Sequence, residues 1–600
     1  MLKPGEFKFE DIVYKGPYNT KRTRCIEKAK CIGFDSESDR NGKTLVFCLS
    51  NGTVIEPEEM PEKILRKYRG FHFFTWNLRY EQGAIIQLLP HENRVELWKT
   101  EKTVYNGIKY TVTGRKHMTI AKLGSKSCIH FWDIAPFYGM SLCRAAKIYL
   151  QKEKLPIEYE NLDEEYFKQN YRKICEACIN HAKLTYELGI KLIDILNKMG
   201  IQVNNLYSQA SIAAEWFAKC CGVEDVLYLW NDEKNREVLR FACESYRGGK
   251  FEISERGYFP HLKSYDIVSA YPYEISRLVS LKNTKILWSN HIPEESIIAY
   301  GFLRCKIKIK DQLPHSVGIL KNGIRCYPIG IFYATITYNE YKYLLENNAD
   351  IDIIKAVWIL TYHKKYPYKK EIERLVQLKN KYKNKLMEYR LCKIIMNGFY
   401  GKLAQLIKQG NIIKAGPYWN PIFASYITAN VRIRISQLQQ EFGYSIKAVH
   451  TDSVLIDKSL ELLKPEIVGK DLGKFSKENE GEAIIISTGN YQIGKKIATR
   501  GLCFEKGESW KDKLQQFPKQ YKIKITNRNV LSWREAIRIH KEEFINKFIE
   551  EDKIFDLNYD KKRLWLEEFN TEDFLNKTEK GFLFPIFELK PFWERSDLKP

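Results

Sequence analysis

Two aspartates follow apolar segments in the second half of the sequence. Asp266 lies in SYDIVSAYP and Asp452 lies in AVHTDSVLI. A lone aspartate at a strand end is usually a turn or cap residue. Two carboxylates from separate strands can instead hold two Mg²⁺ ions about 3.5–4 Å apart and clamp an in-line phosphoryl transfer. Asp266 and Asp452 are therefore the predicted catalytic, metal-binding pair.

A predicted helix between these aspartates carries groups that would complement a metal site. Lys393, Asn397, Tyr400 and Gly401 stand at i, i+4, i+7 and i+8 in KIIMNGFYGK, so they share one helical face. A cation, an amide and a ring on that face could hold a triphosphate and a base. An ordinary amphipathic helix is an equally weighted alternative.

The charge of the chain favours a polyanionic partner. Lys and Arg number 97 against 74 Asp and Glu, a net charge of +23. Residues 361–415 hold 14 Lys and Arg and 3 Asp and Glu, so this short segment carries +11. A lysine-rich surface caused by genome composition would spread more evenly. The clustering therefore indicates a nucleic-acid contact.

The elements that must position these residues alternate between strands and helices. Apolar runs and their spacing predict strands in 26–50, 71–76, 128–134 and 301–337, a long helix over 163–199, and a strand leading into a helix over 258–278. Two basic helices joined near residue 380 are predicted over 369–408, a further helix over 421–441, and a strand pair over 445–458 with its tip at Asp452. This pattern predicts an α/β or α+β chain of several domains.

Composition excludes several classes of protein. The 600 residues are 44% hydrophobic, which excludes wholesale disorder. No apolar run approaches the roughly 18 residues of a membrane span, and the charged N-terminus does not resemble a signal peptide. The 14 cysteines are scattered, and Cys175 and Cys178 have no second pair at zinc spacing. A reduced protein of the cytoplasm is expected.

Four segments together resemble the motifs of family B DNA polymerases, in the family's order. They are Tyr246-Arg-Gly248-Gly249 for the linking motif, Asp266-Ile-Val-Ser-Ala-Tyr271-Pro for motif A, Lys393 with Asn397-Gly-Phe-Tyr400-Gly for motif B, and His450-Thr-Asp452-Ser for motif C. CYPIGIFYATITYNEYKYLLENNADI and PIFASYITANVRIRI resemble the phage, plasmid and viral branch, which includes the organellar and viral, protein-primed type. The resemblance covers roughly residues 30–500.

The resemblance implies an RNase H-like 3′–5′ exonuclease-type domain followed by a right-hand polymerase with palm, fingers and thumb. The expected divisions are an N-terminal segment 1–25, the exonuclease-type domain 26–200, a linker 201–255, palm 256–310, an insertion 311–360, fingers 361–415, palm 416–480 and thumb 481–600.

The resemblance also implies the activity and its partners. The expected enzyme is a DNA-directed DNA polymerase that binds a primer–template and dNTPs and uses two Mg²⁺ ions, with Mn²⁺ as a substitute. Asp266 and Asp452 are the implied catalytic pair, and Tyr271 is the implied gate against ribonucleotides. Lys381, Lys393, Asn397 and Tyr400 complete the implied nucleotide-binding set, and Tyr246, Gly248, Gly249, Lys495 and Lys496 are the implied DNA-binding residues.

Two departures from the polymerase motifs are His450, which replaces the first motif C aspartate, and Ala270, which replaces a leucine. The resemblance also marks Asp35, Glu37, Asn77 and Glu81 as exonuclease-type site residues, but Glu81 stands where aspartate is expected. The last position falls on Cys175 or His181, and neither supplies a carboxylate. A weak or absent proofreading activity is therefore expected.

Two other functions compete with an active polymerase. One is an inactive polymerase-like protein that only binds nucleic acid, and the other is an exonuclease that uses His181. The priming mode also stays open. The 127 residues from Asp266 to Lys393 leave room for the first insertion of protein-primed members, but the 55 from Asn397 to Asp452 leave little for the second. A terminal protein primer is thus one alternative.

Overall fold

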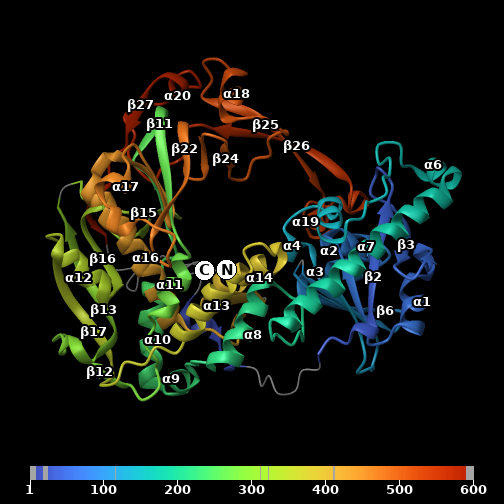
Figure 1. Ribbon diagram of the computed structural model, residues 1–600, viewed down its shortest axis with the longest axis horizontal. Coiled ribbons are helices and arrows are strands. Elements are labelled where there is room, and N and C mark those ends of the chain that lie inside the picture. Colours follow the sequence, from blue (N-terminus) through green and yellow to red (C-terminus); the bar gives the residue numbers. More distant parts are fainter. Residues whose placement is uncertain are drawn as a thin grey trace.

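The computed structural model of the chain describes residues 8–17, 25–114, 116–310, 312–321, 323–409 and 412–589. It is an α+β fold of several domains, as the sequence predicted. Figure 1 shows the N-terminal domain at one end, the polymerase-like part at the other, and helices between them.

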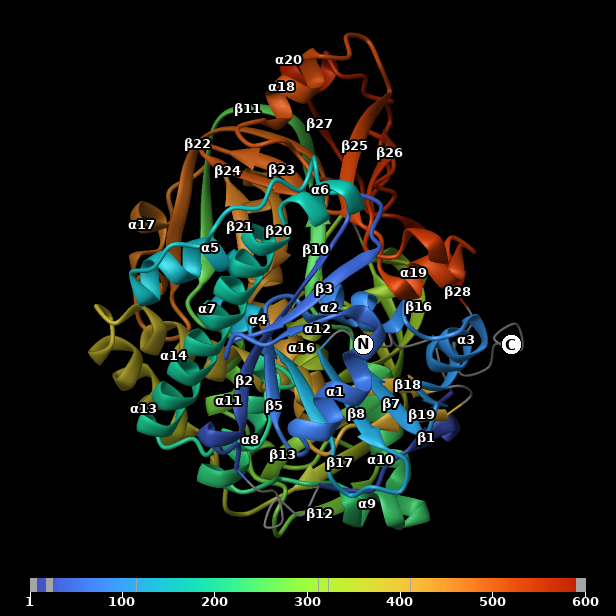
Figure 2. The same ribbon diagram turned by 90° about the vertical axis from the view of Figure 1, so that its right-hand side faces the viewer.

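The N-terminal domain is built on a mixed sheet in the order β4-β3-β2-β5-β9-β8-β7-β6. Its strands are β2 (Cys31–Ser38), β3 (Thr44–Leu49), β4 (Val54–Ile55), β5 (His72–Thr75), β6 (Lys102–Tyr105), β7 (Ile108–Thr113), β8 (His117–Lys122) and β9 (Ile129–Asp133). β2 is buried along its whole length, because it lies inside the sheet and α7 (Tyr171–Lys198) packs against it. Figure 2 looks onto this sheet and α7. The strands and the long helix predicted here are confirmed.

Shorter helices surround that sheet and lead into the polymerase part. They are α1 (Met60–Lys67), α2 (Leu78–Ile86), α3 (His91–Thr100), α4 (Ala135–Tyr138), α5 (Leu142–Ala145) and α6 (Glu164–Gln169), followed by α8 (Gln209–Cys221), α9 (Leu227–Asn231) and α10 (Glu233–Ser245). No described helix combines the length and apolar character that crossing a bilayer requires.

The palm is an antiparallel sheet in the order β10-β20-β21-β11-β22-β23-β24, and β27 also pairs with β11. The strands are β10 (Lys250–Ile253), β11 (Glu255–Ile267), β20 (Ile446–Thr451), β21 (Ser453–Ile456), β22 (Phe475–Ser487), β23 (Asn490–Ile493), β24 (Lys496–Thr499) and β27 (Thr578–Lys580). Helices α11 (Ala270–Ser276), α16 (Pro421–Phe442) and α17 (Leu460–Leu463) accompany it. Asn420 caps α16 and Pro421 opens it, because proline at the first helical position needs no backbone donor.

A second sheet follows the first part of the palm, in the order β12-β17-β13-β16-β28. It contains β12 (Lys285–Trp288), β13 (Ile298–Ile309), β16 (Ile329–Thr337), β17 (Asp350–Leu360) and β28 (Pro585–Leu589), with the hairpin β14 (Ile319–Lys321) and β15 (Ile324–Cys326) and helix α12 (Tyr338–Glu346) beside it. The predicted boundary at residue 311 therefore cuts through a folded unit. β13 pairs with both β16 and β17, so it lies with the insertion and not with the palm.

The basic segment forms two helices joined by a short turn. These are α13 (Lys369–Lys381) and α14 (Leu386–Gly398), followed by α15 (Tyr400–Leu403). The prediction of helix up to residue 408 was wrong at its end, because the chain turns into the hairpin β18 (Leu406–Gln409) and β19 (Ile412–Ala415). The short N-terminal strand β1 (Ile12–Val13) pairs with β19.

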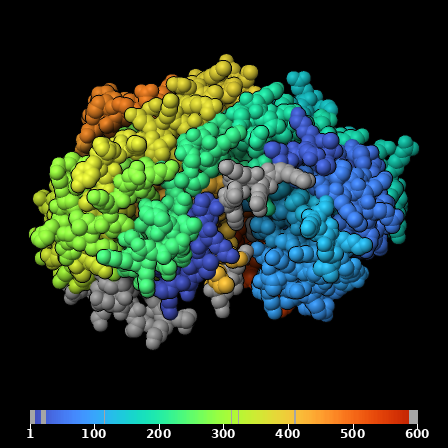
Figure 3. Space-filling model, turned by 90° about the horizontal axis from the view of Figure 1, so that it is seen from below, coloured from blue at the N-terminus to red at the C-terminus, as the bar shows by residue number. Residues whose placement is uncertain are grey.

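A long hairpin connects the thumb with the N-terminal domain. β25 (Lys522–Val530) and β26 (Phe548–Asp556) run from the palm side toward that domain, and α19 (Trp533–Arg538) lies at the tip (Figure 1). The remaining thumb helices are α18 (Trp510–Gln515) and α20 (Asp573–Asn576). Leu531, Trp533 and Ile545 belong to the same buried cluster as strands of the N-terminal sheet. Seen from below, the surface is hollowed between the blue N-terminal domain and the green elements of the polymerase-like part (Figure 3).

Candidate active sites

Asp266 and Asp452 lie at neighbouring strand ends in the palm. β11 pairs with β21 so that Asp266 is opposite Ser453, and the Ile267 amide donates to the Asp452 carbonyl at 2.9 Å. Asp452 occupies the tip of the β20–β21 hairpin, where its amide donates back to the His450 carbonyl at 2.9 Å. Thr451, at the centre of this tight turn, has φ +65°. Such a φ is strained for a β-branched residue, and strain of this kind gathers at functional sites.

The pKa values of both aspartates are raised, as expected for carboxylates that lie close together without a bound cation. Burial, together with the nearby charges of Asp452 and Glu478, raises the pKa of Asp266 to about 7, although Lys496 and Lys393 oppose the rise. Burial also raises the pKa of Asp452 to about 6. Two half-buried carboxylates that repel each other are a donor set that a divalent cation would stabilise.

Glu478 is a site residue that sequence reasoning missed. The register of β11 with β22 shifts between Ser264 and Tyr265, and this leaves Glu478 as the extra residue of a bulge. Bulges beside active sites commonly redirect a side chain. The sequence offered only a run of charged residues here, so no signal separated Glu478 from the solvated acids around it.

His450 is buried beside the aspartate pair. Its ring stacks on Tyr491, with 4.5 Å between centroids. Burial, together with the charges of Lys496 and Lys562, lowers the pKa of His450 to about 3, so the ring is neutral. Both ring nitrogens are buried without a hydrogen-bond partner among the described residues. His450 therefore supplies no negative charge where the family motif has its first aspartate.

Tyr271 and Tyr400 meet face to face. Their ring centroids are 4.1 Å apart and their planes differ by 4°. Burial raises the pKa of Tyr400, and the neighbouring Tyr271 and Tyr246 side chains oppose the rise. The predicted gate, the motif B tyrosine and the linking-motif tyrosine thus form one group, brought together from α11, α15 and the turn after α10.

The predicted lysines occupy unequal positions. Lys393 is exposed on α14, and its positive charge acts to lower the pKa of Asp266. Lys381 is exposed at the last residue of α13, whereas Lys379 is half-buried and has its pKa lowered by burial and by Lys393. Lys379 is thus the lysine of α13 that interacts electrostatically with Lys393. The sequence spacing had pointed to Lys381 instead. Asn397 is exposed one turn beyond Lys393 on α14.

Lys495 and Lys496 follow Gly494 in the turn from β23 to β24, and both side chains are exposed. The positive charge of Lys496 acts to lower the pKa of both Asp266 and His450. Lys496 therefore lies near the aspartate pair. The resemblance had implied only a DNA contact for this residue.

The linking motif touches motif C. A Cβ atom on Gly249 would lie 2.7 Å from Cγ2 of Thr451, the residue before Asp452. Gly248 has φ +68°, a left-handed conformation that glycine adopts without strain. These two glycines are therefore required by the turn itself, and the turn supports the strained tip that carries Asp452.

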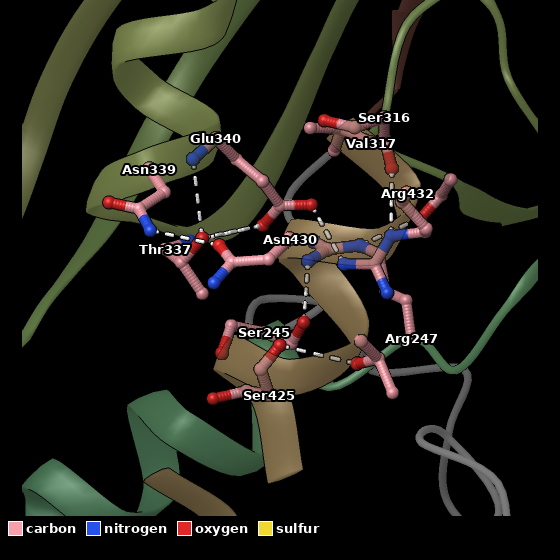
Figure 4. Close-up of polar contacts among 12 residues, drawn as sticks. Ser245, Arg247, Ser316, Val317, Thr337, Asn339, Glu340, Ser425, Asn430 and Arg432 are labelled. Atoms are coloured by element: carbon pink, nitrogen blue, oxygen red, sulfur yellow. Dashed lines mark hydrogen bonds and ion pairs between the residues drawn. The ribbon is translucent and has the colours of Figure 1, made fainter. Parts of the chain in front are cut away.

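A buried arginine holds this turn against the insertion (Figure 4). Arg432 of α16 donates to the Gly248 carbonyl at 2.6 Å, the Ser316 carbonyl at 3.0 Å and the Glu340 carboxylate at 2.8 Å. Arg247 adds bonds to the Ser245, Gly318 and Thr335 carbonyls. Both side chains are buried, so each donor has a protein partner in place of water.

The predicted exonuclease-type residues also meet, on β2 and α7. Nδ1 of His181 lies 3.2 Å from Oδ2 of Asp35 and 3.3 Å from Oε1 of Glu37. Burial acts to lower the pKa of His181, but its hydrogen bonds to the two carboxylates raise it to about 9. Helix α7 can approach β2 this closely because Gly33 has no Cβ atom. A Cβ atom at this position would lie 1.9 Å from the Ala182 carbonyl oxygen. Of the two registers left open by the sequence, the structure selects His181.

The other exonuclease-type residues border this group. Glu81 is 2% exposed, and burial followed by the charge of Asp35 raises its pKa. Asn77 is exposed at the start of α2, where its backbone amide donates to the Asp133 carboxylate. Cys175 lies instead near Cys48, whose thiol approaches the Cys175 carbonyl. Tyr159 was missed by sequence reasoning: the charges of Glu37 and Asp35, with burial, raise its pKa well above normal.

Comparison with known sequences matches the region that holds motifs A and B. The family described as DNA polymerase type B, organellar and viral, matches residues 137–415. A curated DNA polymerase of Acidianus bottle-shaped virus (isolate Italy/Pozzuoli) is 30% identical over 301 residues, which are 46% of this chain and 43% of the relative. The match therefore spans less than half the length of that viral relative.

Comparison with solved structures extends the likeness to most of the chain. Phi29 DNA polymerase in complex with primer–template DNA and incoming nucleotide has a TM-score of 0.63 at 14% identity, over 88% of this chain and 99% of that one. Its post-translocation complex with primer–template DNA has a TM-score of 0.55 at 16% identity, over 78% and 89%. The fold is thus an exonuclease-type domain joined to a right-hand polymerase. The resemblance to family B DNA polymerases of the organellar and viral branch is confirmed for residues 137–415.

Proposed function

We propose that this chain is a template-directed DNA polymerase that extends a primer with dNTPs in the replication of a viral, phage or plasmid-like genome. The observation that carries the proposal is the placement of Asp266 and Asp452 at the ends of paired strands, where the charges of Lys393 and Lys496 act on Asp266. An inactive nucleic-acid-binding protein would have no reason to keep two mutually repelling, half-buried carboxylates beside two lysines.

In the proposed reaction, the primer 3′-oxygen forms a bond to the α-phosphorus of the dNTP. The bond from that phosphorus to the bridging oxygen breaks, pyrophosphate leaves with the electron pair, and the hydroxyl proton passes to solvent. Family B polymerases use divalent metal ions. Asp266 and Asp452 would hold two Mg²⁺ ions, or Mn²⁺ as a substitute, and the bound ions would neutralise the developing phosphate charge. Lys393 would contact the triphosphate, and Tyr271 would lie under the sugar.

The proposal gives the exonuclease-type domain weak or absent proofreading in Mg²⁺. A histidine stands between Asp35 and Glu37, where the family pattern would bring a further carboxylate. The direct test is a 5′-labelled single strand with a mismatched 3′ end, incubated with Mg²⁺ and no dNTPs. Slow degradation is expected, and rapid Mg²⁺-dependent degradation that Asp35→Ala abolishes would contradict it.

Single-turnover primer extension in Mg²⁺ tests the polymerase itself. A singly primed template is used with and without a downstream duplex block, so that strand displacement is measured in the same experiment. Extension that requires all four dNTPs and follows the template is expected. Tight primer–template binding without extension in Mg²⁺ or Mn²⁺ would support the nucleic-acid-binding alternative. A terminal protein primer is tested by replacing the DNA primer with a protein hydroxyl, and the proposal does not depend on that result.

A further inference from the structure

The exonuclease-type site has an uncommon set of donors for a domain of this kind. Asp35 and Glu37 project from β2, His181 projects from α7, and all three side chains are buried. Their donor atoms lie within 4.8 Å of one another, and within the described ranges no other group of three or more His, Cys, Asp or Glu meets this condition.

The orientation of the His181 ring is fixed from outside the group. Its Nε2 lies 2.8 Å from the Leu155 carbonyl, which can only accept, so Nε2 carries hydrogen. In the neutral ring, Nδ1 then directs its lone pair toward the two carboxylates. Histidines that bind metals usually show this arrangement, with the second nitrogen donating to a backbone carbonyl.

The spacing of the donors fits a single ion. Bonds of about 2.1 Å from a metal to nitrogen and oxygen place neighbouring donors about 3.0 Å apart in an octahedron. The distances from Nδ1 to Asp35 and Glu37 are 3.2 and 3.3 Å. The two carboxylate donors lie within 4.8 Å of each other, so closure of the group around an ion would bring all three donors into contact with it.

A second observation indicates that the group is incomplete without a cation. Oε2 of Glu81 is buried and has no hydrogen-bond partner among the described residues, and the side chain is 2% exposed. The charge of Asp35 acts on it directly. A buried carboxylate oxygen without a donor is costly, and an ion held at Asp35 would offset that cost.

We infer that Asp35, Glu37 and His181 form a site for one transition-metal ion of the Mn²⁺ or Zn²⁺ class, with Glu81 at its edge, and that the site discriminates against Mg²⁺. Imidazole suits these metals, whereas Mg²⁺ takes oxygen donors in a strict octahedron. This departs from the carboxylate-bound ion pair that the family resemblance implies. It deepens the proposal for the exonuclease-type domain and is independent of the polymerase proposal.

The test measures metal binding in the full chain, not activity. Asp266→Asn and Asp452→Asn are combined first, so that the polymerase site no longer competes. Mn²⁺ is then titrated and the free ion is followed by electron paramagnetic resonance. We expect one tightly bound Mn²⁺ that a large excess of Mg²⁺ does not displace, and a nitrogen coupling in the electron spin echo that reports a directly bound imidazole.

Variants at His181 decide the outcome. His181→Asp should abolish the nitrogen coupling and lower the affinity for Mn²⁺ relative to Mg²⁺ at least about tenfold, so that Mg²⁺ competes. Loss of a group that only supports a metal ligand already costs about tenfold or more in affinity, and loss of the ligand itself should cost no less. His181→Gln repeats the loss of coupling if the aspartate disturbs folding, which circular dichroism checks. His91→Gln, at an exposed histidine of the same domain, is the control. Absence of coupling in the parent, or displacement by equal Mg²⁺, would overturn the inference and leave His181 as a proton-bearing cation between the carboxylates.

Discussion

The rings of Tyr271 and Tyr400 stack in parallel, 4.1 Å apart. This contact joins motif A to motif B, so Tyr400 fixes the position of the residue that should exclude ribonucleotides. Tyr271→Val should lower the preference for dNTPs over rNTPs by about 10–200-fold, because a steric contact of this kind contributes about 1–3 kcal/mol. Tyr400→Leu should lower it in the same direction and Tyr400→Phe should not. Incorporation ratios measure this, and an unchanged ratio in both Tyr271→Val and Tyr400→Leu places the gate elsewhere.

Asp266→Asn and Asp452→Asn should each reduce the rate of primer extension by about 10²–10³-fold, as expected when fixed charge that stabilises the transition state is removed. Single-turnover rates at saturating dNTP measure the effect. Asp471→Asn, at an exposed carboxylate of the same part of the chain, is the matched control and should leave the rate unchanged. Near-normal extension by Asp452→Asn would falsify the assignment.

The raised pKa values of the pair predict how stability depends on pH without metal. The pKa of Asp266 is about 7 in the fold against an ordinary value of 3.8. The folded chain therefore binds more protons than the unfolded chain between these values, so this group's contribution falls as pH rises from about 4 to 7. Asp266→Asn should be more stable than the parent at pH 8, by about 1–2 kcal/mol once solvent screening of the half-exposed site is allowed for. The difference should vanish at pH 4, as urea unfolding in EDTA would measure. Added Mg²⁺ should stabilise the parent and not the variant.

Lys393→Ala should lower kcat/KM for dNTPs by about 10–150-fold, the equivalent of about 1.5–3 kcal/mol for a charged hydrogen bond. The dissociation constant for primer–template should change little. Lys379→Ala tests the half-buried neighbour, and Lys381→Ala shows whether the exposed end of α13 also reaches the triphosphate. A loss of DNA affinity with normal dNTP kinetics in Lys393→Ala would make it a contact to the DNA backbone.

Gly249→Ala should impair extension although residue 249 carries no reacting group. The new Cβ would lie 2.7 Å from Cγ2 of Thr451 and would move the turn that carries Asp452. Thr451→Gly removes that methyl and also relieves the positive φ, so the double variant should recover most of the rate. Single-turnover rates of the three variants measure this coupling. If the double variant is no faster than Gly249→Ala alone, the linking motif acts through DNA and not through motif C.

The sequence predicted that Asp266 and Asp452 lie at strand ends, because the apolar residues next to each aspartate give a local signal. The helix α16 was predicted almost to the residue, since Asn420 and Pro421 mark its start and its apolar residues continue for six turns. Bulges and turns carry no such periodic signal. Glu478 therefore escaped prediction, as did the Gly249–Thr451 contact, which joins segments about 200 residues apart.

Domain boundaries were harder still, because pairing between distant strands decides them. The sequence pattern of β13 does not differ from that of a palm strand. Only its pairing with β16 and β17 assigns it to the insertion. The anchorage of Trp533 in the N-terminal domain is a similar case. Nothing in the local pattern of α19 indicates which of several apolar surfaces it will cover.

That anchorage has a consequence for synthesis of the chain. The buried cluster of the N-terminal sheet is completed by Leu531, Trp533, Ala536, Ile537 and Ile545, whereas the last helix of that domain ends at Lys198. At about 5–20 residues per second, the ribosome adds the intervening roughly 330 residues in about 15–65 s. During that interval the N-terminal domain exposes apolar side chains that its own segment cannot cover. This domain is thus completed only after residues 531–545 have been made, and a fragment ending near residue 200 would leave this surface open to aggregation.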